Sequence, residues 1–420
     1  MDDPGKARTR RRLRAVMVLC YLLFLALLVE GASFAAGRIL QSKWSMYRDP
    51  VAPDQARLVS YAEYLERRHP RWGWPRLEEF GESYAPNGAR WCLDSGVPEE
   101  APWLVSLYGD SFTADAVGGD TDHWGCRMQR QLRARVENFG VGGYGTDQAL
   151  LRYLDQTEDA SRVVVLGHMS EDILRNLTRY RDFQNFTRSW AFKPRFVRGD
   201  GGDLEHVPLP RLTESEYRRF LALEAPQLFL EHELFHPNGP SGAVRLTFPY
   251  SIAFLRNLGY FELQSRLAGQ PSYARFYEPG HPFGGLELTR AILLEFVKVA
   301  RRRGQEPVLI LFPDRMELEA HQETGRWYMQ PLLESLQAAG IEPIQFGEVL
   351  TAHLDGRPAA EAFGRGSPGA RTHYSLEVSH LVADTVLAHL SDRSLLVGAS
   401  PHGGGSRSLA ESTGRGVALE

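Results

Sequence analysis

Residues 104–111 read LVSLYGDS, an apolar run that leads directly into a Gly-Asp-Ser turn. Further short runs rich in β-branched or aliphatic residues follow, and helical patterns lie between most of them. The runs are RVENFGV (135–141), SRVVVLGH (161–168), EPVLILFP (306–313) and IEPIQF (341–346). This alternation is typical of a parallel sheet that helices cover on both faces. It predicts an α/β fold, a doubly wound (flavodoxin-like) parallel sheet of about five strands.

Length and composition place the chain among globular proteins. With 420 residues, it can form one sizeable domain with additional segments. A hydrophobic fraction of 43% and a charged fraction of 24% exclude a mainly disordered, collagenous or multi-span membrane protein. Three cysteines are too few for a disulfide-rich scaffold.

The charge is concentrated at the N-terminus. Residues 1–14 carry six basic and two acidic side chains, a net charge of +4. The whole chain carries −4, so the remaining residues carry −8. An acidic body does not attract phosphate backbones, and we therefore expect no nucleic-acid partner.

An apolar segment follows this basic tail. Residues 15–29 read AVMVLCYLLFLALLV, and within 15–36 only Glu30 is charged. A membrane-spanning helix needs about 20 apolar residues, and basic flanks stay in the cytoplasm. We predict a basic cytoplasmic tail at 1–14, a single-pass transmembrane anchor at 15–36 and an extracytoplasmic (periplasmic) remainder. A cleaved signal peptide stays open as the alternative, since Ser33-Phe34-Ala35 offers a small-x-small site.

The rest of the chain divides by composition. Residues 37–100 are expected to form a stalk and a wrapping extension, and 101–395 the α/β domain. The strand and helix rhythm stops at 177–283, which predicts a large insertion over one end of the sheet. The Gly/Ser-rich tail at 396–420 is predicted to be disordered. Helices are expected at 124–134, 147–157, 285–303 and 326–339.

The turn after the first strand carries the most specific chemical signal. Ser111 follows Gly109 and Asp110 at the carboxyl end of the strand, where open α/β sheets bind ligands. A serine hydroxyl at this position becomes a nucleophile once a base removes its proton.

Two segments resemble the SGNH (GDSL-like) hydrolase superfamily, in the order in which that family carries them. They are Gly109-Asp110-Ser111 and, after the second strand, the glycine-rich stretch 138–143. The resemblance implies that Ser111 is the nucleophile and that the N–H groups of Ser111 and Gly143 form an oxyanion hole. Asp110 and Asp172 are expected to line the same site.

The third block of the family departs from the usual pattern. Gly-x-Asn-Asp is usual, whereas Glu171-Asp172 stands here after the third strand. The register implies an oxyanion position for Glu171, but an ionised carboxylate cannot donate a hydrogen bond. Ser170 and Asn176 stay open as alternative donors.

The last block departs as well. An Asp-x-x-His sequence is usual, and here Ala370 occupies the position of the acid while His373 occupies that of the base. Loss of the orienting acid from a Ser-His-Asp triad costs about 10⁴ in kcat, which could leave a slow Ser111–His373 dyad.

The resemblance implies a membrane-anchored serine esterase that hydrolyses an O-acyl ester, with O-acetyl groups of an envelope or exported polysaccharide as the expected substrate. No metal or organic cofactor is implied. More distantly, the anchor and the GYGTDQALLRY stretch (143–153) resemble the alginate O-acetyltransferase group. Two alternatives stay open. One is a polysaccharide O-acetyltransferase that uses the same Ser/His pair and a multi-span acyl-donor partner; the other is a catalytically degenerate fold that binds a glycan or a partner.

Two further patterns bear on metals and disulfides. The stretch from His232 to His236 matches HExxH, but Pro237 disfavours a helix at the second histidine, so no zinc site is expected. Cys92 and Cys126 both lie outside the predicted membrane span. The sequence is compatible with a disulfide between them and with two separate thiols.

Overall fold

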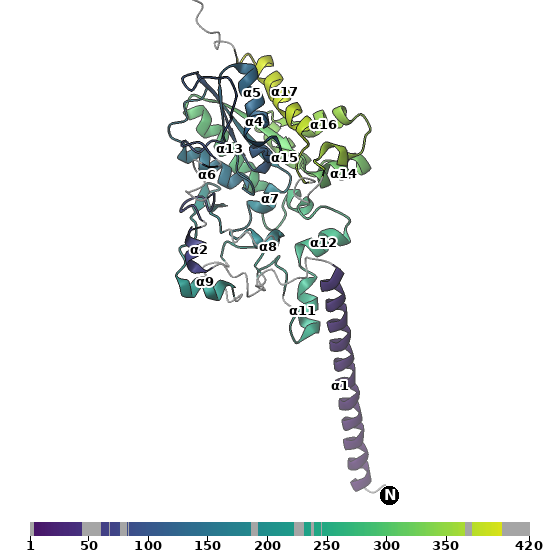
Figure 1. Ribbon diagram of the computed structural model, residues 1–420. Coiled ribbons are helices and arrows are strands. Elements are labelled where there is room, and N and C mark those ends of the chain that lie inside the picture. Colours follow the sequence, from purple (N-terminus) through teal and green to yellow (C-terminus); the bar gives the residue numbers. More distant parts are fainter. Residues whose placement is uncertain are drawn as a thin grey trace, which may run out of the picture.

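The protein, seen in a computed structural model, is a mixed α/β body from which one long helix projects (Figure 1). The structure describes residues 4–43, 60–66, 68–75, 82, 84–185, 192–221, 231–236, 239–244, 246–365 and 372–396. Much of the predicted stalk at 44–59, the Ala370 position and nearly all of the tail predicted at 396–420 lie outside the described residues.

A five-stranded parallel sheet forms the centre of the body, as the sequence predicts. Its order is β2-β1-β3-β6-β7, and every neighbouring pair is parallel. The strands are β1 (Trp103–Tyr108), β2 (Arg135–Asn138), β3 (Val163–Met169), β6 (Glu306–Phe312) and β7 (Ile344–Gln345).

Side chains from successive strand residues enter two hydrophobic cores, because they point to opposite faces of a sheet. In β3, Val164 and Leu166 pack into one core and Val163 and Val165 into the other. The first core is covered by α6 (Thr146–Asp155), α13 (Gly285–Arg302) and α15 (Gln330–Gln337). The second is covered by α5 (Trp124–Leu132), α16 (Phe346–Leu354) and α17 (Leu376–Asp392). Helices therefore lie on both faces of the sheet.

The region between α7 and α13 corresponds to the insertion predicted at 177–283. It contains an antiparallel strand pair and several short helices. Its aromatic residues Tyr180, Phe192, Tyr260 and Phe276 belong to the same core as α6 and α13, so the insertion packs as part of the body. Its elements are α8 (Asp182–Asn185), β4 (Arg195–Arg198), β5 (Leu204–Val207), α9 (Glu214–Leu221), α11 (Tyr250–Asn257), α12 (Phe261–Leu267) and η5 (Ala274–Tyr277).

Short helices complete the body: α2 (Tyr61–Glu66), α3 (Ser111–Ala114), η4 (Ala116–Gly118), α4 (Gly119–Asp122), α7 (Asp172–Arg175), α14 (Arg315–Thr324) and η6 (Ala359–Ala362).

The segment before β1 lies along α6 and the loop that follows β2. The Gln148 side chain donates a hydrogen bond to the Trp72 carbonyl (2.8 Å), and the Tyr144 hydroxyl donates one to the Trp74 carbonyl (2.7 Å). The Arg90 N–H binds the Asn138 carbonyl at the end of β2 (2.7 Å). These contacts hold the segment before β1 against the body.

A disulfide fastens this extension to α5. Cys92 and Cys126 are bonded, with their Cα atoms 5.3 Å apart and a sequence separation of 34 residues. Of the two alternatives that the sequence leaves open, the structure therefore contains the disulfide.

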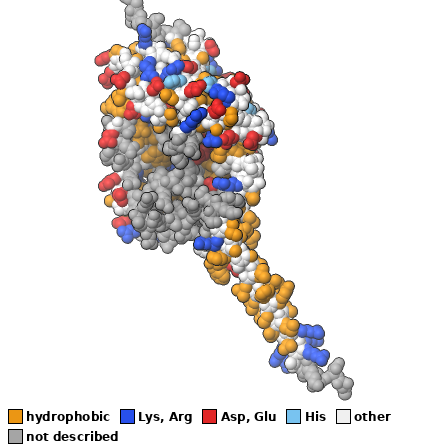
Figure 2. Space-filling view, turned by 45° about the vertical axis from the view of Figure 1, so that its right-hand side comes forward, with side chains coloured by type: hydrophobic (Ala, Val, Ile, Leu, Met, Phe, Trp, Pro, Cys, Tyr) orange, Lys and Arg blue, Asp and Glu red, His pale blue; other side chains and the backbone are white. Residues whose placement is uncertain are grey.

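The projecting helix is α1 (Pro4–Lys43), and it is longer than the segment predicted at 15–36. Within the described residues it is the one helix whose length and composition suit a membrane span, over Arg8–Leu40, and none of its most apolar window is buried. Figure 2 shows hydrophobic side chains along this helix and basic side chains near its free end. The helix is apolar enough to cross a membrane, which suggests an anchor.

Replacing both bridged cysteines, in Cys92→Ala/Cys126→Ala, should lower the free energy of unfolding by about 2–4 kcal/mol, because the unfolded chain loses a covalent loop. Urea unfolding of the full chain in detergent, followed by tryptophan fluorescence, measures this. Cys20→Ala, at an exposed position of α1, is the control and should leave the midpoint unchanged. Equal midpoints for all three proteins would contradict a stabilising bridge.

Candidate functional site

The carboxyl ends of the central strands meet at one edge of the sheet. Tyr108 of β1 is in register with Leu166 of β3, and Met169 of β3 is in register with Phe312 of β6. The turns that leave these strands therefore lie side by side. They are 109–111, 170–175 and 313–314.

The turn at Ser111 is held in a geometry that requires glycine before it. Gly109 has a φ of +157°, and a Cβ at this position would lie 2.1 Å from the Thr113 hydroxyl oxygen. Asp110 then caps α3, since its carboxylate accepts the Phe112 N–H (2.8 Å). Ser111 is the first residue of α3 and is half-buried.

Ser111 and His373 line the same small pocket, although they are far apart in sequence. Tyr374 holds the histidine segment in place: its hydroxyl donates a hydrogen bond to the Pro313 carbonyl after β6 (2.7 Å). The Tyr374 ring also packs edge-on against Phe112 (4.7 Å between centroids). The sequence prediction thus names two residues that the fold brings together.

The remaining walls of this pocket are mostly apolar. Phe112, Trp124, Tyr374 and Val382 line it together with Asp115 and Ser379. The Ser379 hydroxyl donates to Asp115, which also accepts the Trp124 N–H (2.9 Å). Burial raises the pKa of Asp115, and its hydrogen bonds act in the opposite direction.

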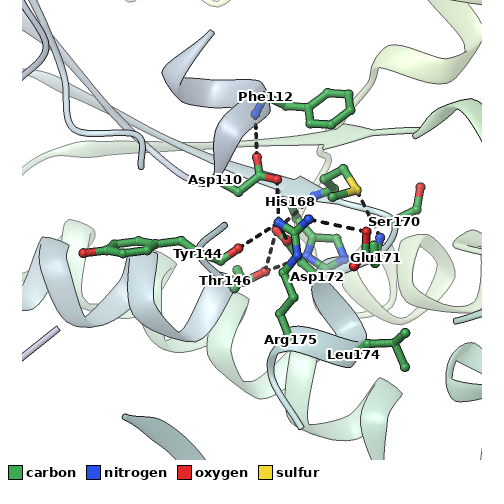
Figure 3. Close-up of polar contacts among 12 residues, drawn as sticks. Asp110, Phe112, Tyr144, Thr146, His168, Ser170, Glu171, Asp172, Leu174 and Arg175 are labelled. Atoms are coloured by element: carbon green, nitrogen blue, oxygen red, sulfur yellow. Dashed lines mark hydrogen bonds and ion pairs between the residues drawn. The ribbon is translucent and has the colours of Figure 1, made fainter. Parts of the chain in front are cut away.

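Beneath the Ser111 turn, a buried arginine connects three segments (Figure 3). Arg175 Nη1 lies 2.9 Å from Asp110 Oδ2, from Asp172 Oδ1 and from the Tyr144 carbonyl oxygen. Asp110 and Asp172 are almost completely buried, 1% and 0% exposed, so their carboxylates support the turn from below rather than line the pocket as the sequence predicts.

The charges in this cluster determine which groups are ionised. Burial acts to lower the pKa of Arg175, but the carboxylates of Glu171, Asp172 and Asp110 raise it above its ordinary value. Burial, and then the charge of Asp110, raise the pKa of Asp172 well above its usual range.

A chain of hydrogen bonds runs from this cluster into the insertion. The Thr146 hydroxyl lies 2.7 Å from His168 Nδ1 and 3.4 Å from Asp172 Oδ2. His168 Nε2 lies 2.9 Å from the Tyr277 hydroxyl, which donates to the Ser170 carbonyl (2.8 Å). Because Tyr277 uses its proton there, His168 Nε2 is the donor toward Tyr277 and Nδ1 accepts from Thr146. Burial lowers the pKa of His168 to about 3, so this ring is neutral.

Glu171 is bound by two arginines. Its carboxylate lies 3.5 Å from Arg175 and 3.4 Å from Arg181. Burial, and then the charge of Arg175, lower the pKa of Arg181 to about 10, which still leaves it charged at pH 7. Glu171 is therefore an ion-paired acceptor and cannot donate to an oxyanion.

The two alternative donors are already occupied. Ser170 Oγ donates to the Phe312 carbonyl (3.3 Å) and accepts the Asp314 N–H (3.1 Å). Asn176 accepts the Asp147 N–H (3.1 Å), and its amide donates to Thr289 Oγ1 (3.0 Å). Both side chains use these hydrogen bonds to stabilise the loop, so neither is placed as a donor to an oxyanion.

The glycine-rich loop after β2 is fixed against the Ser111 turn. The Val141 N–H donates to the Gly109 carbonyl (3.1 Å), and a Cβ on Gly140 would lie 2.4 Å from the Ala114 nitrogen. Gly143 has a φ of +80°, which favours glycine. Within the described part of the chain, the N–H groups of Ser111 and Gly143 donate to no protein acceptor.

A hydroxyl lies next to the His373 ring. His373 Nδ1 is 3.2 Å from the neighbouring Thr372 hydroxyl, and Ala370 lies outside the described residues. Sequence reasoning also missed Arg175. One feature of the sequence could have indicated its role. Arg175 follows Asp172 by three residues and Glu171 by four, a spacing that places all three side chains on the same side of a helix.

The HExxH stretch is not helical. Residues 231–236 form turns and bends, so the histidines do not lie one helical turn apart. The Glu233 carboxylate accepts the N–H groups of Arg179 and Phe235 and the hydroxyl of Thr178, which is a structural use of this buried acid. Among the described residues, no group of three or more acidic, histidine or cysteine side chains is arranged to hold a metal.

Comparison with known proteins assigns no family. No family model matches the chain, and no curated protein matches its sequence. Solved structures with some likeness include a protein from Lactobacillus plantarum, with a TM-score of 0.32 and 10% identity over 70% of this chain and 98% of that one. Another, from Bacillus subtilis, has a TM-score of 0.31 and 9% identity over 71% of this chain and 58% of that one. Both come from structural genomics work.

The buried arginine should be essential for stability. Arg175→Met removes the guanidinium in contact with Asp110, whose buried carboxylate then loses this counter-charge, and the free energy of unfolding should fall by about 3–5 kcal/mol. Urea unfolding of the full chain in detergent measures the loss. Arg218→Met, which removes an exposed ion pair with Glu214 (side chain 75% exposed), is the control and should change stability far less. Equal losses for the two variants would contradict the role of the cluster.

Proposed function

We propose that the protein is a membrane-anchored, extracytoplasmic serine esterase that hydrolyses short O-acyl esters. The observation that carries the proposal is that Ser111 and His373 line one pocket at the carboxyl edge of the sheet. A serine hydroxyl and an imidazole that share a pocket are the minimum for nucleophilic acyl transfer.

In the proposed reaction, Ser111 Oγ attacks the acyl carbon while His373 takes the hydroxyl proton. The N–H groups of Ser111 and Gly143 bind the negative charge that develops on the carbonyl oxygen. The alcohol leaves with the proton from His373. Water then attacks the acyl carbon while His373 takes its proton, and His373 returns that proton to Ser111 Oγ as the carboxylic acid leaves.

The small pocket with mostly apolar walls favours a small acyl group. Phe112, Trp124, Tyr374 and Val382 line the space beside Ser111. O-acetyl esters of an envelope or exported polysaccharide are therefore the proposed substrate class, with the sugar outside the pocket.

The architecture supports the placement of the site. The strand order β2-β1-β3-β6-β7, with helices on both faces, favours a doubly wound, flavodoxin-like sheet. Such sheets bind ligands where the strand order reverses, which here is beside β1 and β3. The apolar helix α1 and its basic flank support a single-pass anchor with its N-terminus in the cytoplasm.

A fluorophosphonate probe tests the nucleophile. The purified full chain should be labelled at Ser111 and should hydrolyse p-nitrophenyl acetate, and Ser111→Ala should lose both activities. Ser335→Ala, on α15 away from the pocket, is the matched serine control and should keep them. Absence of labelling in the unaltered chain would contradict the esterase proposal. It would favour the alternative of a catalytically degenerate fold that binds a glycan or a partner. Acetyl transfer to an oligosaccharide at the expense of hydrolysis would point to a transferase.

Glu171 should limit the rate. The resemblance assigns position 171 to an oxyanion donor, and Glu171→Asn replaces a carboxylate there with an amide that can donate, so kcat should rise about tenfold or more. Steady-state hydrolysis of p-nitrophenyl acetate measures this. Glu295→Gln, on the surface of α13, is the charge-matched control and should leave kcat unchanged. An unchanged kcat for Glu171→Asn would place Glu171 outside the reach of the oxyanion.

A further inference from the structure

An apolar face of the insertion is exposed next to the projecting helix. Phe248, Ile252 and Leu255 are 74%, 54% and 63% exposed, and they follow the spacing of one side of α11. Leu258 and Leu267 extend this exposed apolar surface toward and onto α12. Below, these five residues are called the α11 face.

The N-terminus of α11 is docked on α1. The Glu30 carboxylate accepts the Tyr250 N–H (2.6 Å), and it also binds the N–H and the hydroxyl of Ser251. The Phe34 ring packs against that of Tyr250, with 4.9 Å between centroids. Further along α1, Gly37 lies so close to Leu246 that a Cβ would be 2.3 Å from its Cδ2. Glu30, Phe34 and Gly37 lie on one side of α1.

The position of Glu30 along α1 places this contact inside the membrane. From Ala15 to Glu30 the helix rises about 22 Å at 1.5 Å per residue. A bilayer core is about 30 Å thick, so Glu30 lies in its outer part when Ala15 is at the cytoplasmic boundary. An ionisable side chain at such a depth requires polar partners. Here the first N–H groups of α11 supply them.

We propose that the α11 face is a second membrane-contacting element, which lies among the lipid acyl chains of the outer leaflet beside α1. This inference rests on the proposed membrane anchor. Lipid is the occupant because the α11 face continues the exposed apolar surface of α1, against which α11 packs (Figures 1 and 2). Arg256 and Arg266 are exposed on α11 and α12, where their long side chains can reach phosphate head groups.

Two contacts with the membrane restrict the orientation of the body more than α1 alone would. A second contact through α11 fixes its tilt, and the Ser111 pocket then stays at a defined height above the head groups.

Fluorescence quenching by spin-labelled lipid tests the proposal. The full chain with Cys20→Ser carries a single added cysteine in Leu22→Cys, Ile252→Cys, Leu255→Cys or Ala388→Cys, each labelled with the dye NBD. The proteins are placed in nanodiscs of phosphatidylcholine and phosphatidylglycerol, with or without doxyl groups on the acyl chains. Ala388 is exposed on α17, far from α1, and is the aqueous control (Figure 1). Quenching at positions 252 and 255 should exceed that at 388 at least about threefold.

The outcomes separate this inference from the anchor. Strong quenching at 22 with none at 252 and 255 would overturn the membrane contact of α11 and leave the anchor in place. No quenching at 22 would overturn the anchor and the inference together. In Glu30→Leu, which removes the acceptor for α11, quenching at 252 and 255 should fall about twofold while that at 22 stays the same. Unchanged quenching in this variant would show that Glu30 does not dock α11.

Discussion

One buried positive charge, that of Arg175, holds together the edge of the sheet where the strands end. Arg175 is nearly inaccessible to water, and a guanidinium in such a place is tolerated only when carboxylates and carbonyl groups replace its hydration. Its partners come from the end of β1, from the start of α7 and from the loop before α6. If one of the three segments shifted alone, a buried charge would lose its partner. The turn that presents Ser111 is therefore fixed from below.

The same network joins the insertion to the sheet. Tyr277 reaches His168 and Ser170 from a 3₁₀ turn that lies more than a hundred residues beyond β3. The aromatic core of the insertion is continuous with that of α6 and α13. The insertion therefore behaves as part of the body, and its exposed elements, including α11, are held in a defined orientation relative to the sheet.

The sequence predicted those parts that depend on local pattern. The strand runs, the helices between them and the Ser111 turn after β1 are all specified by neighbouring residues, and the structure confirms the parallel five-stranded sheet. The pairing of Ser111 with His373 in one pocket also agrees with the expectation. The ion cluster was not predictable in this way, because Asp110 and Arg175 are 65 residues apart in sequence and only the packing of three segments decides that they meet. For the same reason, the burial of Asp172 and the arginine partners of Glu171 follow from tertiary structure alone.

The contact between Glu30 and α11 also has a consequence for the order of synthesis. The two partners are separated by 220 residues, so the membrane helix is complete long before its capping segment exists. At roughly 5–20 residues per second, the interval is about 10–45 s. On the proposed membrane arrangement, the nascent helix must wait through this period with an unsatisfied carboxylate near the lipid surface. Protonation of Glu30, or retention of the helix at the translocation channel until α11 emerges, would avoid this cost.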